Sequence, residues 1–153
     1  MLNIQFMSLL LNISIVIITF WLMEFIAWAT HKYVMHGFLW KLHKDHHQVN
    51  KDRILENNDA FFLIFAIPGA VFMILGSTLL YIGIGITLYG FAYFIIHEVF
   101  IHQRIKLFKR TRIRYFKAIR KAHKVHHKSR LKKDGSCFGM LIVPFKYWKE
   151  AKV

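Results

Sequence analysis

All ten histidines of this 153-residue sequence lie in four short motifs. In the first motif, four residues separate two histidines. In the second motif, a histidine is followed three and four residues later by two adjacent histidines. Both motifs then recur in the same order. The motifs comprise His31 and His36, then His43, His46 and His47, then His97 and His102, and finally His123, His126 and His127. Neutral imidazole is the commonest metal ligand, and ten exceed the needs of one ion. The sequence therefore predicts two metal ions held close together.

The spacing within the motifs predicts how each would serve a metal. Residues three and four apart lie on one face of an α-helix, so each three-histidine motif can present its imidazoles in one direction. Residues five apart differ by about 140° around an ideal helix. Such a pair reaches one site only if the helix ends or distorts there, or if each histidine serves a different ion. Gly37 directly follows His36, which is typical of a helix end.

Long runs without charge predict membrane spans. Residues 4–23 contain no charged residue, and residues 60–96 contain none across 37 positions. As one helix the second run would be about 55 Å long, against a hydrocarbon core of about 30 Å. It therefore divides into two spans, with a turn at Gly76-Ser77 or near Gly83 and Gly85.

The order of the histidine motifs also requires the long apolar run to cross the membrane twice. The first two motifs precede the long apolar run and the last two follow it, so two crossings bring all four to one side. We expect a single membrane-embedded domain over residues 1–153 with spans at about 4–28, 59–76 and 78–97. The predicted class is an all-α membrane protein with about three transmembrane helices. A cytoplasmic helical cap would carry the histidine-rich dimetal site.

The charge distribution predicts the orientation. The formal net charge is +14, and of 22 Lys and Arg residues five lie in residues 32–53 and 17 in residues 104–152. Basic residues confined to segments beside apolar spans indicate a cytoplasmic membrane face, not a nucleic-acid surface. We expect the N-terminus outside and the site on the cytoplasmic side of the inner membrane. The basic segment 104–122 is amphipathic and fits either the membrane interface or a helix packed on the histidine motifs.

The donor atoms limit the choice of metal. Nitrogen-rich ligation without thiolate suits iron, zinc, copper or nickel, whereas a structural zinc ion needs only four ligands. Ten imidazoles on two ions leave room for an open position, which favours O2 chemistry. Candidate catalytic carboxylates that would orient metal-bound imidazoles are Glu98, Asp45 and Asp59. Asp59 and also Glu24 lie at predicted membrane boundaries, where an acidic residue is equally typical of a solvated helix cap.

The motif order resembles the fatty acid hydroxylase/sterol desaturase superfamily of membrane-bound non-haem di-iron enzymes. Within it, the flanking residues resemble the bacterial β-carotene hydroxylases over about residues 24–144. The segments that carry this resemblance are 31–37, 43–47, 58–61, 97–104, 123–127 and 134–139. One departure is His97-Glu98-Val99, where a glycine is expected after the acidic residue.

The resemblance implies hydroxylation of β-carotene at C3 of each β-ionone ring, giving β-cryptoxanthin and then zeaxanthin. It implies two iron ions bound by the ten histidines, O2 as co-substrate, and an external electron donor such as ferredoxin with its reductase. The sequence has one cysteine and no glycine-rich dinucleotide loop, so we expect no internal electron donor. Zinc or nickel can replace iron on purification, because iron(II) binds nitrogen sites more weakly.

Two alternatives remain open from the residues. One is another lipid hydroxylase, desaturase or ketolase of the same superfamily, which product analysis separates. The other is a membrane metal-binding or transport protein. A transporter should place polar ligands near the bilayer midplane, whereas these motifs lie at one end of the predicted spans.

Overall fold

The computed structural model describes residues 2–48, 55–108, 110–133 and 135–151. Within these ranges all regular secondary structure is helical, which confirms the predicted all-α class. Asp134, which belongs to a segment used for the family resemblance, lies outside the described residues.

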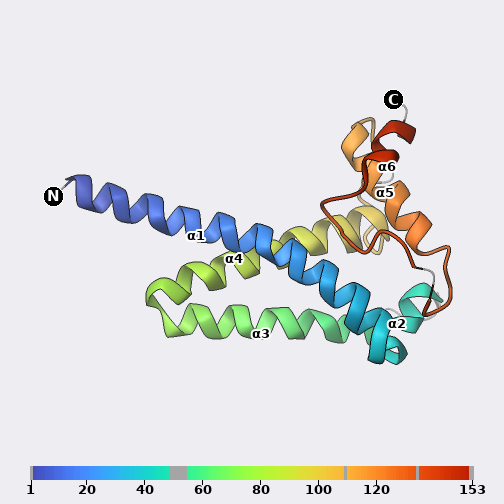
Figure 1. The fold of residues 1–153 in the computed structure, drawn as a ribbon, viewed down its shortest axis with the longest axis horizontal. Coiled ribbons are helices and arrows are strands. Elements are labelled where there is room, and N and C mark those ends of the chain that lie inside the picture. Colours follow the sequence, from blue (N-terminus) through green and yellow to red (C-terminus); the bar gives the residue numbers. More distant parts are fainter. Residues whose placement is uncertain (1, 49–54, 109, 134, 152–153) are drawn as a thin grey trace.

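Three apolar helical rods form the body of the molecule, and each is long and apolar enough to cross a membrane. They are α1 (Leu2–Ala29) continuing into the π-helix η1 (Thr30–Phe38), α3 (Ala60–Leu75) together with the helical turn before it, and α4 (Ser77–Tyr93) continuing into the π-helix η3 (Phe94–Ile101). The second candidate span is accordingly Asn57–Leu75. Helix α4 packs against both α1 and α3 (Figure 1). This arrangement returns the chain to the side of the first two histidine motifs before the last two begin (Figure 1).

The turn between α3 and α4 lies at Gly76 and Ser77, as one of the two predictions had it. Gly76 has a φ of 72° and Ser77 a φ of 51°. The other predicted turn, at Gly83 and Gly85, was wrong because both residues lie inside α4. Their small size instead permits close packing: a Cβ at Gly83 would come within 2.7 Å of the Gly69 carbonyl oxygen of α3. Small residues have this role wherever membrane helices approach closely.

The remaining helices gather at one end of the rods and form a cap (Figure 1). They are α2 (Trp40–His47), the 3-10 helix η2 (Asn57–Asp59), α5 (Arg114–His126) and α6 (Phe145–Glu150). The apolar stripe of α5 is buried against the C-terminal segment, where Ile119 packs with Val143 and Tyr147. This burial supports the alternative in which the basic helix packs on the cap.

Glu24 of α1 links the C-terminal segment to the membrane helices through hydrogen bonds. One carboxylate oxygen accepts hydrogen bonds from the backbone N–H groups of Met140, Leu141 and Ile142 at 2.9, 2.9 and 3.0 Å. The other oxygen accepts one from the Tyr89 hydroxyl of α4 at 2.8 Å. An acidic residue inside an apolar helix requires such partners, so Glu24 fixes residues 140–142 against α1 and α4.

Candidate metal centre

A π-helical turn at each pair of histidines five residues apart brings the two imidazoles close together. The Leu39 N–H donates to the Val34 carbonyl at 3.0 Å, and the His102 N–H donates to the His97 carbonyl at 2.9 Å. The first bond crosses Gly37, whose φ of −101° and ψ of −123° are non-helical, so η1 also kinks directly after His36. Both bonds span five residues, so the helix is locally wider than an α-helix and residues five apart come closer to one line. The ring centroids of His97 and His102 accordingly lie 4.6 Å apart. π-Helical bulges of this kind are frequent at functional sites.

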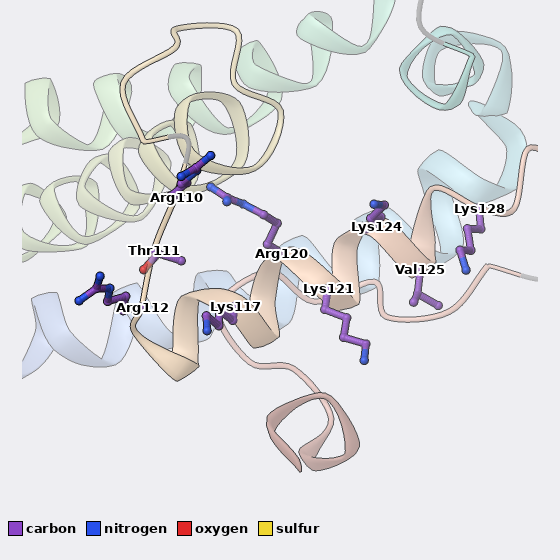
Figure 2. A pocket seen from close by; sticks show the side chains of 9 residues that line it. All are labelled: Arg110, Thr111, Arg112, Lys117, Arg120, Lys121, Lys124, Val125 and Lys128. Atoms are coloured by element: carbon purple, nitrogen blue, oxygen red, sulfur yellow. The ribbon is translucent and has the colours of Figure 1, made fainter. Parts of the chain in front are cut away.

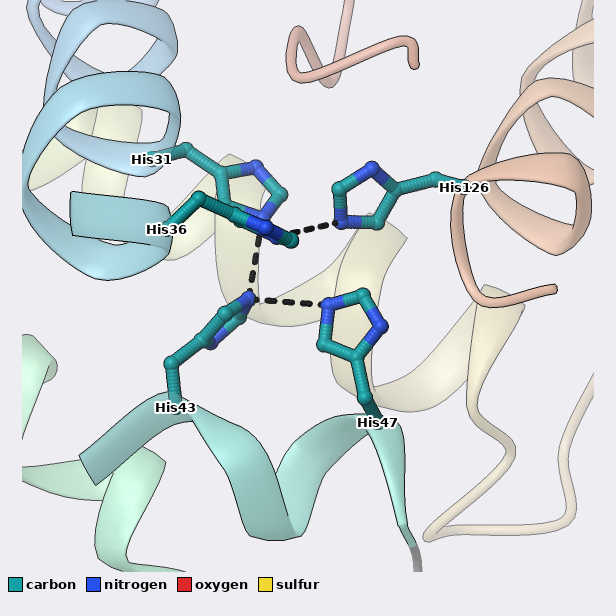
Figure 3. A group of neighbouring side chains, drawn as sticks. All are labelled: His31, His36, His43, His47 and His126. Carbon is teal, nitrogen blue, oxygen red and sulfur yellow. Dashed lines mark hydrogen bonds between the residues drawn. The ribbon is translucent and has the colours of Figure 1, made fainter. Parts of the chain in front are cut away.

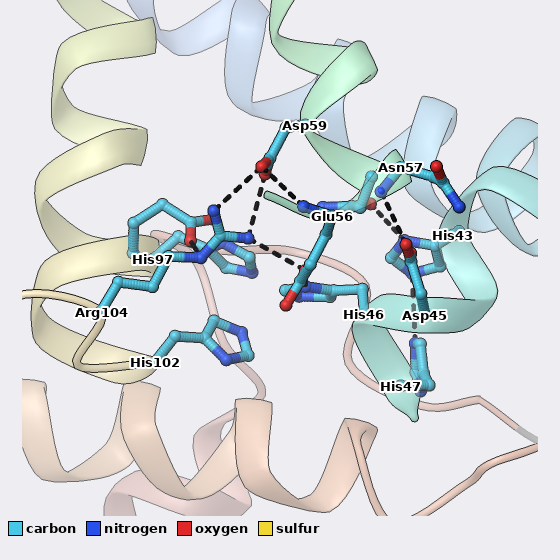
Figure 4. A network of polar contacts seen from close by, with 12 residues as sticks. His43, Asp45, His46, His47, Glu56, Asn57, Asp59, His97, His102 and Arg104 are labelled. Carbon is cyan, nitrogen blue, oxygen red and sulfur yellow. Dashed lines mark hydrogen bonds and ion pairs between the residues drawn. The ribbon is translucent and has the colours of Figure 1, made fainter. Parts of the chain in front are cut away.

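The imidazoles form two groups. In each group, every residue offers a ring nitrogen within 4.8 Å of the others. The first histidine group is His31, His36, His43, His47 and His126 (Figure 3). The second histidine group is His46, His97, His102 and His123, of which Figure 4 shows the first three. Because His126 joins the first group and His46 joins the second, the two halves of the chain interlock and neither group is built from one half alone.

His127, the tenth histidine, lies between the two groups. Its ring centroid is 4.6 Å from that of His47 and 4.5 Å from that of His123. Its Nε2 atom and that of His46 are buried without a hydrogen-bond partner among the described residues. A buried nitrogen without a partner is costly unless an unseen ligand satisfies it, so both atoms fit metal ligation.

The outward-facing nitrogens set the tautomer of most rings. In seven of the ten histidines, Nδ1 contacts a carbonyl, amide or carboxylate oxygen of the protein at 2.6 to 3.2 Å. The pairs are His31 with Phe138, His36 with Lys132, His43 with Asn58, His46 with Glu56, His47 with Ser129, His97 with Glu98, and His126 with Ser136. Each oxygen accepts the Nδ1 proton, which leaves the Nε2 lone pair facing the centre of the cluster.

The inward-facing nitrogens converge at ligand spacing. In the first histidine group, the Nε2 atom of His43 lies 3.1 Å from those of His31 and His47. In the second, the Nε2 atoms of His102 and His123 are 2.9 Å apart. Two nitrogens that ligate one ion at a right angle, each about 2.1 Å away, are separated by about 3 Å. The residues therefore fit two nitrogen-ligated metal ions.

Burial favours the unprotonated form of several of these side chains. Together with neighbouring imidazoles, it lowers the pKa of His43 to about 2, that of His102 and His126 to about 3, and that of His47 to about 4. A metal ligand must be the neutral imidazole, so the site is ready to bind at neutral pH without first losing protons.

A charged network supports the second histidine group (Figure 4). Nδ1 of His46 donates to Glu56 at 2.7 Å, and Nδ1 of His97 donates to Glu98 at 2.6 Å. Arg104 joins the two carboxylates, with Nη2 3.0 Å from Glu56 and Nε 2.7 Å from Glu98. Charge-assisted bonds of this type orient the imidazoles and increase their basicity.

The structure places the three candidate carboxylates at different distances from the imidazoles. Glu98 contacts a histidine directly, as described above. Asp59 pairs with Arg104 at 3.0 Å, and Asp45 accepts the Asn57 N–H at 2.6 Å. Asp59 also accepts the Glu56 N–H at 3.0 Å. Neither carboxylate has a described hydrogen bond or ion pair with a histidine.

Sequence reasoning missed Glu56 and Asn58. Asn58 accepts the Nδ1 proton of His43 at 2.6 Å. A signal for Glu56 was present, because Glu56 and Asp59 form a capping box directly before an apolar run. That pattern identifies a helix start and does not reveal that the same carboxylate reaches His46.

The comparisons with known proteins agree with this site. The profile of the family described as fatty acid hydroxylase matches residues 16–148, and the chain belongs to that family. It is 39% identical over 137 residues to the β-carotene hydroxylase of Pantoea ananas, covering 87% of this chain and 78% of the relative. It is 35% identical over 135 residues to the β-carotene hydroxylase of Paracoccus sp. strain PC1, covering 85% and 83%. No solved structure gave a significant match. The family resemblance found in the sequence is confirmed.

Proposed function

We propose that this protein is an O2-dependent di-iron monooxygenase that hydroxylates β-carotene at C3 of its β-ionone rings. The products would be β-cryptoxanthin and then zeaxanthin. The observation that carries this proposal is the pair of interlocking histidine groups at the end of three apolar rods. The similarity to bacterial proteins named β-carotene hydroxylase supports the choice of substrate.

The first histidine group would hold one iron ion and the second histidine group the other, with His127 between them. Iron, when bound, supplies the redox chemistry that activates O2 and attacks an unactivated C–H bond. The chain itself fixes the ligands through the Nδ1 contacts and favours neutral His43, His47, His102 and His126 by burial. It also places the site where the apolar helices end (Figure 1). Each hydroxylation consumes one O2, two electrons and two protons, and releases water.

The depth of the site favours a hydrocarbon without a polar headgroup. Both histidine groups lie where the apolar rods end, beside the expected membrane boundary. An acyl lipid keeps its headgroup at that boundary, so its chain terminus lies about 15 Å away near the bilayer centre. A carotene has no headgroup, and its ring can approach the boundary from within the hydrocarbon. A site at this depth therefore suits a carotene ring better than the far end of a fatty acyl chain.

The orientation would place the cap in the cytoplasm of a cell whose inner membrane holds the protein. The support is the confinement of Lys and Arg to the cap segments and the segments beside it. Single cysteines introduced at Asn3 and at Lys149, in a Cys137→Ser background, should be labelled from opposite sides by an impermeant maleimide. Labelling of both from the same side would contradict the three-span topology.

Electrons would come from an acidic carrier such as ferredoxin with its reductase. Seven Lys and Arg side chains from residues 110–128 line a broad cavity of about 1020 Å³ (Figure 2). Helix α5 buries His123 and His126 on one face and exposes Lys121 and Lys124 on another, so only one helix separates this surface from the metal centre. Attraction of this kind raises the association rate and weakens with salt. Turnover without any protein donor would contradict this part of the proposal.

The decisive test is expression in cells that accumulate β-carotene, followed by pigment chromatography. We expect dihydroxylated carotenoid from the natural chain and none from the His43→Ala variant. Lys41→Ala, on the exposed side of the same helix, is the matched control and should retain activity. A keto or newly desaturated carotenoid, or no polar product, would contradict the proposed reaction.

A further inference from the structure

A second cavity, of about 480 Å³, lies beside the first histidine group. One wall is α1, which contributes Trp21, Glu24, Phe25 and Trp28. These positions recur at helical spacing and therefore lie on one face of the helix. The other wall comes from the segment 137–144, which Glu24 fastens to α1.

The cavity presents an apolar lining, because the one charged side chain in it has its oxygens engaged elsewhere, and the rim of the cavity is exposed. Glu24 is the one charged residue of the lining, and both of its oxygens are already engaged by backbone N–H groups and by Tyr89. Trp21 is 53% exposed, Phe25 61% and Ile142 64%, so the rim faces the surroundings of the membrane helices. The volume lies within the range of small-molecule sites, about 300–1,000 Å³.

Phe138 separates this cavity from the metal centre. Its ring centroid lies 5.5 Å from that of His31, 5.1 Å from that of His36 and 5.2 Å from that of His126. Its carbonyl also accepts the Nδ1 proton of His31 at 2.9 Å. A single aromatic side chain therefore lies between the cavity and the first histidine group.

Neighbouring side chains mark the depth of the cavity in the membrane. The Lys32 ammonium lies 5.2 Å from the Trp28 ring centroid and 5.0 Å from that of Tyr33. Trp, Tyr and Lys gather where a membrane helix meets the headgroups. Trp28 is the last lining residue that α1 contributes, and Trp21 lies two turns deeper, so the cavity opens into the hydrocarbon just beneath this level.

We propose that this cavity binds the ring terminus of the lipid-dissolved cyclic hydrocarbon substrate, and that Phe138 positions the ring against the first histidine group. The inference rests on the proposed function and adds to it the path of access. A ring without hydrogen-bonding groups suits an apolar lining with no unsatisfied polar atom. The polyene would extend from the open rim along α1 into the bilayer.

Cys137 lines this cavity, is half-buried, and is the sole cysteine of the sequence, so its alkylation reports occupancy. The protein as purified, in lipid nanodiscs and without an electron donor, would be treated with N-ethylmaleimide. We expect β-carotene to slow labelling of Cys137 at least fivefold, and the acyclic hydrocarbon squalene to slow it less than twofold. The matched control is Cys137→Ser with Ile64→Cys, on the exposed face of α3, where β-carotene should have no effect. Equal labelling of Cys137 with and without β-carotene would overturn the proposal.

A variant at the rim gives an independent measurement. Ile142→Trp should fill the mouth, abolish the protection of Cys137 and lower kcat/KM for β-carotene at least tenfold, with metal content unchanged. Ile64→Trp, on the exposed face of α3 and outside the cavity, is the matched control and should change kcat/KM less than twofold. If β-carotene protects Cys137 but no hydroxylated product forms, the cavity assignment stands and the proposed function fails. If zeaxanthin forms while Cys137 is unprotected and Ile142→Trp is fully active, the cavity assignment fails.

Discussion

The two histidine groups hold their imidazoles by different means. In the first group, four Nδ1 protons go to backbone carbonyls of residues 129–138 and that of His43 goes to the Asn58 amide oxygen. In the second, two go to the carboxylates of Glu56 and Glu98, which Arg104 joins. An imidazole that is hydrogen-bonded to a carboxylate is more basic, and so a stronger metal ligand, than one that is hydrogen-bonded to a neutral oxygen. The two metal positions are therefore chemically unequal, although the motifs that build them are repeated.

The largest expected effect is the loss of a ligand from either group. Substitution of His43 or His126 in the first group, or of His46 or His123 in the second, with alanine should lower hydroxylation by more than about 100-fold, because loss of a partner outside the ligands already costs 10–100-fold. Metal analysis should show that the ion of the altered group is lost preferentially. Near-normal activity in two or more of these variants would contradict a shared dimetal centre.

Removal of Arg104 should weaken metal binding at the second histidine group more than at the first. Arg104→Gln leaves Glu56 and Glu98 without their common cation, so we expect metal affinity to fall by about 10- to 100-fold at the second group and little at the first. Competition with a chelator, followed by metal counting, measures this. Arg130→Gln, an exposed arginine in the segment after α5, is the control and should behave like the natural protein. Equal weakening of both ions would show that the network is not specific to one group.

A smaller effect should follow from neutralising one carboxylate. Glu56→Gln retains an oxygen that can accept the Nδ1 proton of His46 but removes the negative charge, and we expect metal affinity at the second group to fall by about tenfold. Glu150→Gln is the control, because Glu150 pairs with Lys121 on the exposed surface. An unchanged affinity in Glu56→Gln would mean that the hydrogen bond matters and the charge does not.

The smallest effect is a dependence of stability on pH. Burial lowers the folded-state pKa of His43 to about 2 and that of His47 to about 4, from an ordinary value of 6.5. The unfolded chain therefore binds more protons as the pH falls below about 6.5, and stability present above that pH is lost toward pH 4. Between pH 7.5 and 6.0 we expect the Tm in detergent to fall by a few degrees. A Tm that rises over this interval would have the wrong sign for neutral buried imidazoles.

The histidine motifs and the fold class could be recognised in the sequence because they depend on local information. Residue type and spacing identify the histidines, and the absence of charge identifies the apolar rods. The pairing of the halves could not be predicted, because the choice that sends His126 to one group and His46 to the other is made by tertiary packing. The spacing of five residues required the helix to end or distort at each pair, but it did not identify the distortion as a π-helical turn, because periodicity assumes α-helical geometry.

The supporting residues were harder still to predict. Glu24 was noted as an acid at a membrane boundary, yet its partners lie 116 to 118 residues further along the sequence. Asn58 begins one of the segments that carry the family resemblance, but its role became visible only through its contact with His43. Asp45 and Asp59 were sensible candidates by proximity, but their nearest partners are a backbone N–H and an arginine.

The central claim is that one chain holds two unequal, nitrogen-ligated iron ions. Mössbauer spectroscopy of protein stripped of metal and reconstituted anaerobically with 57Fe(II), combined with iron counting, tests it most directly. The account predicts two irons per chain and two quadrupole doublets of equal area with different splittings. It also predicts that Glu56→Gln shifts only one of them. One iron per chain, or a Glu56→Gln spectrum in which both doublets move together, would contradict it.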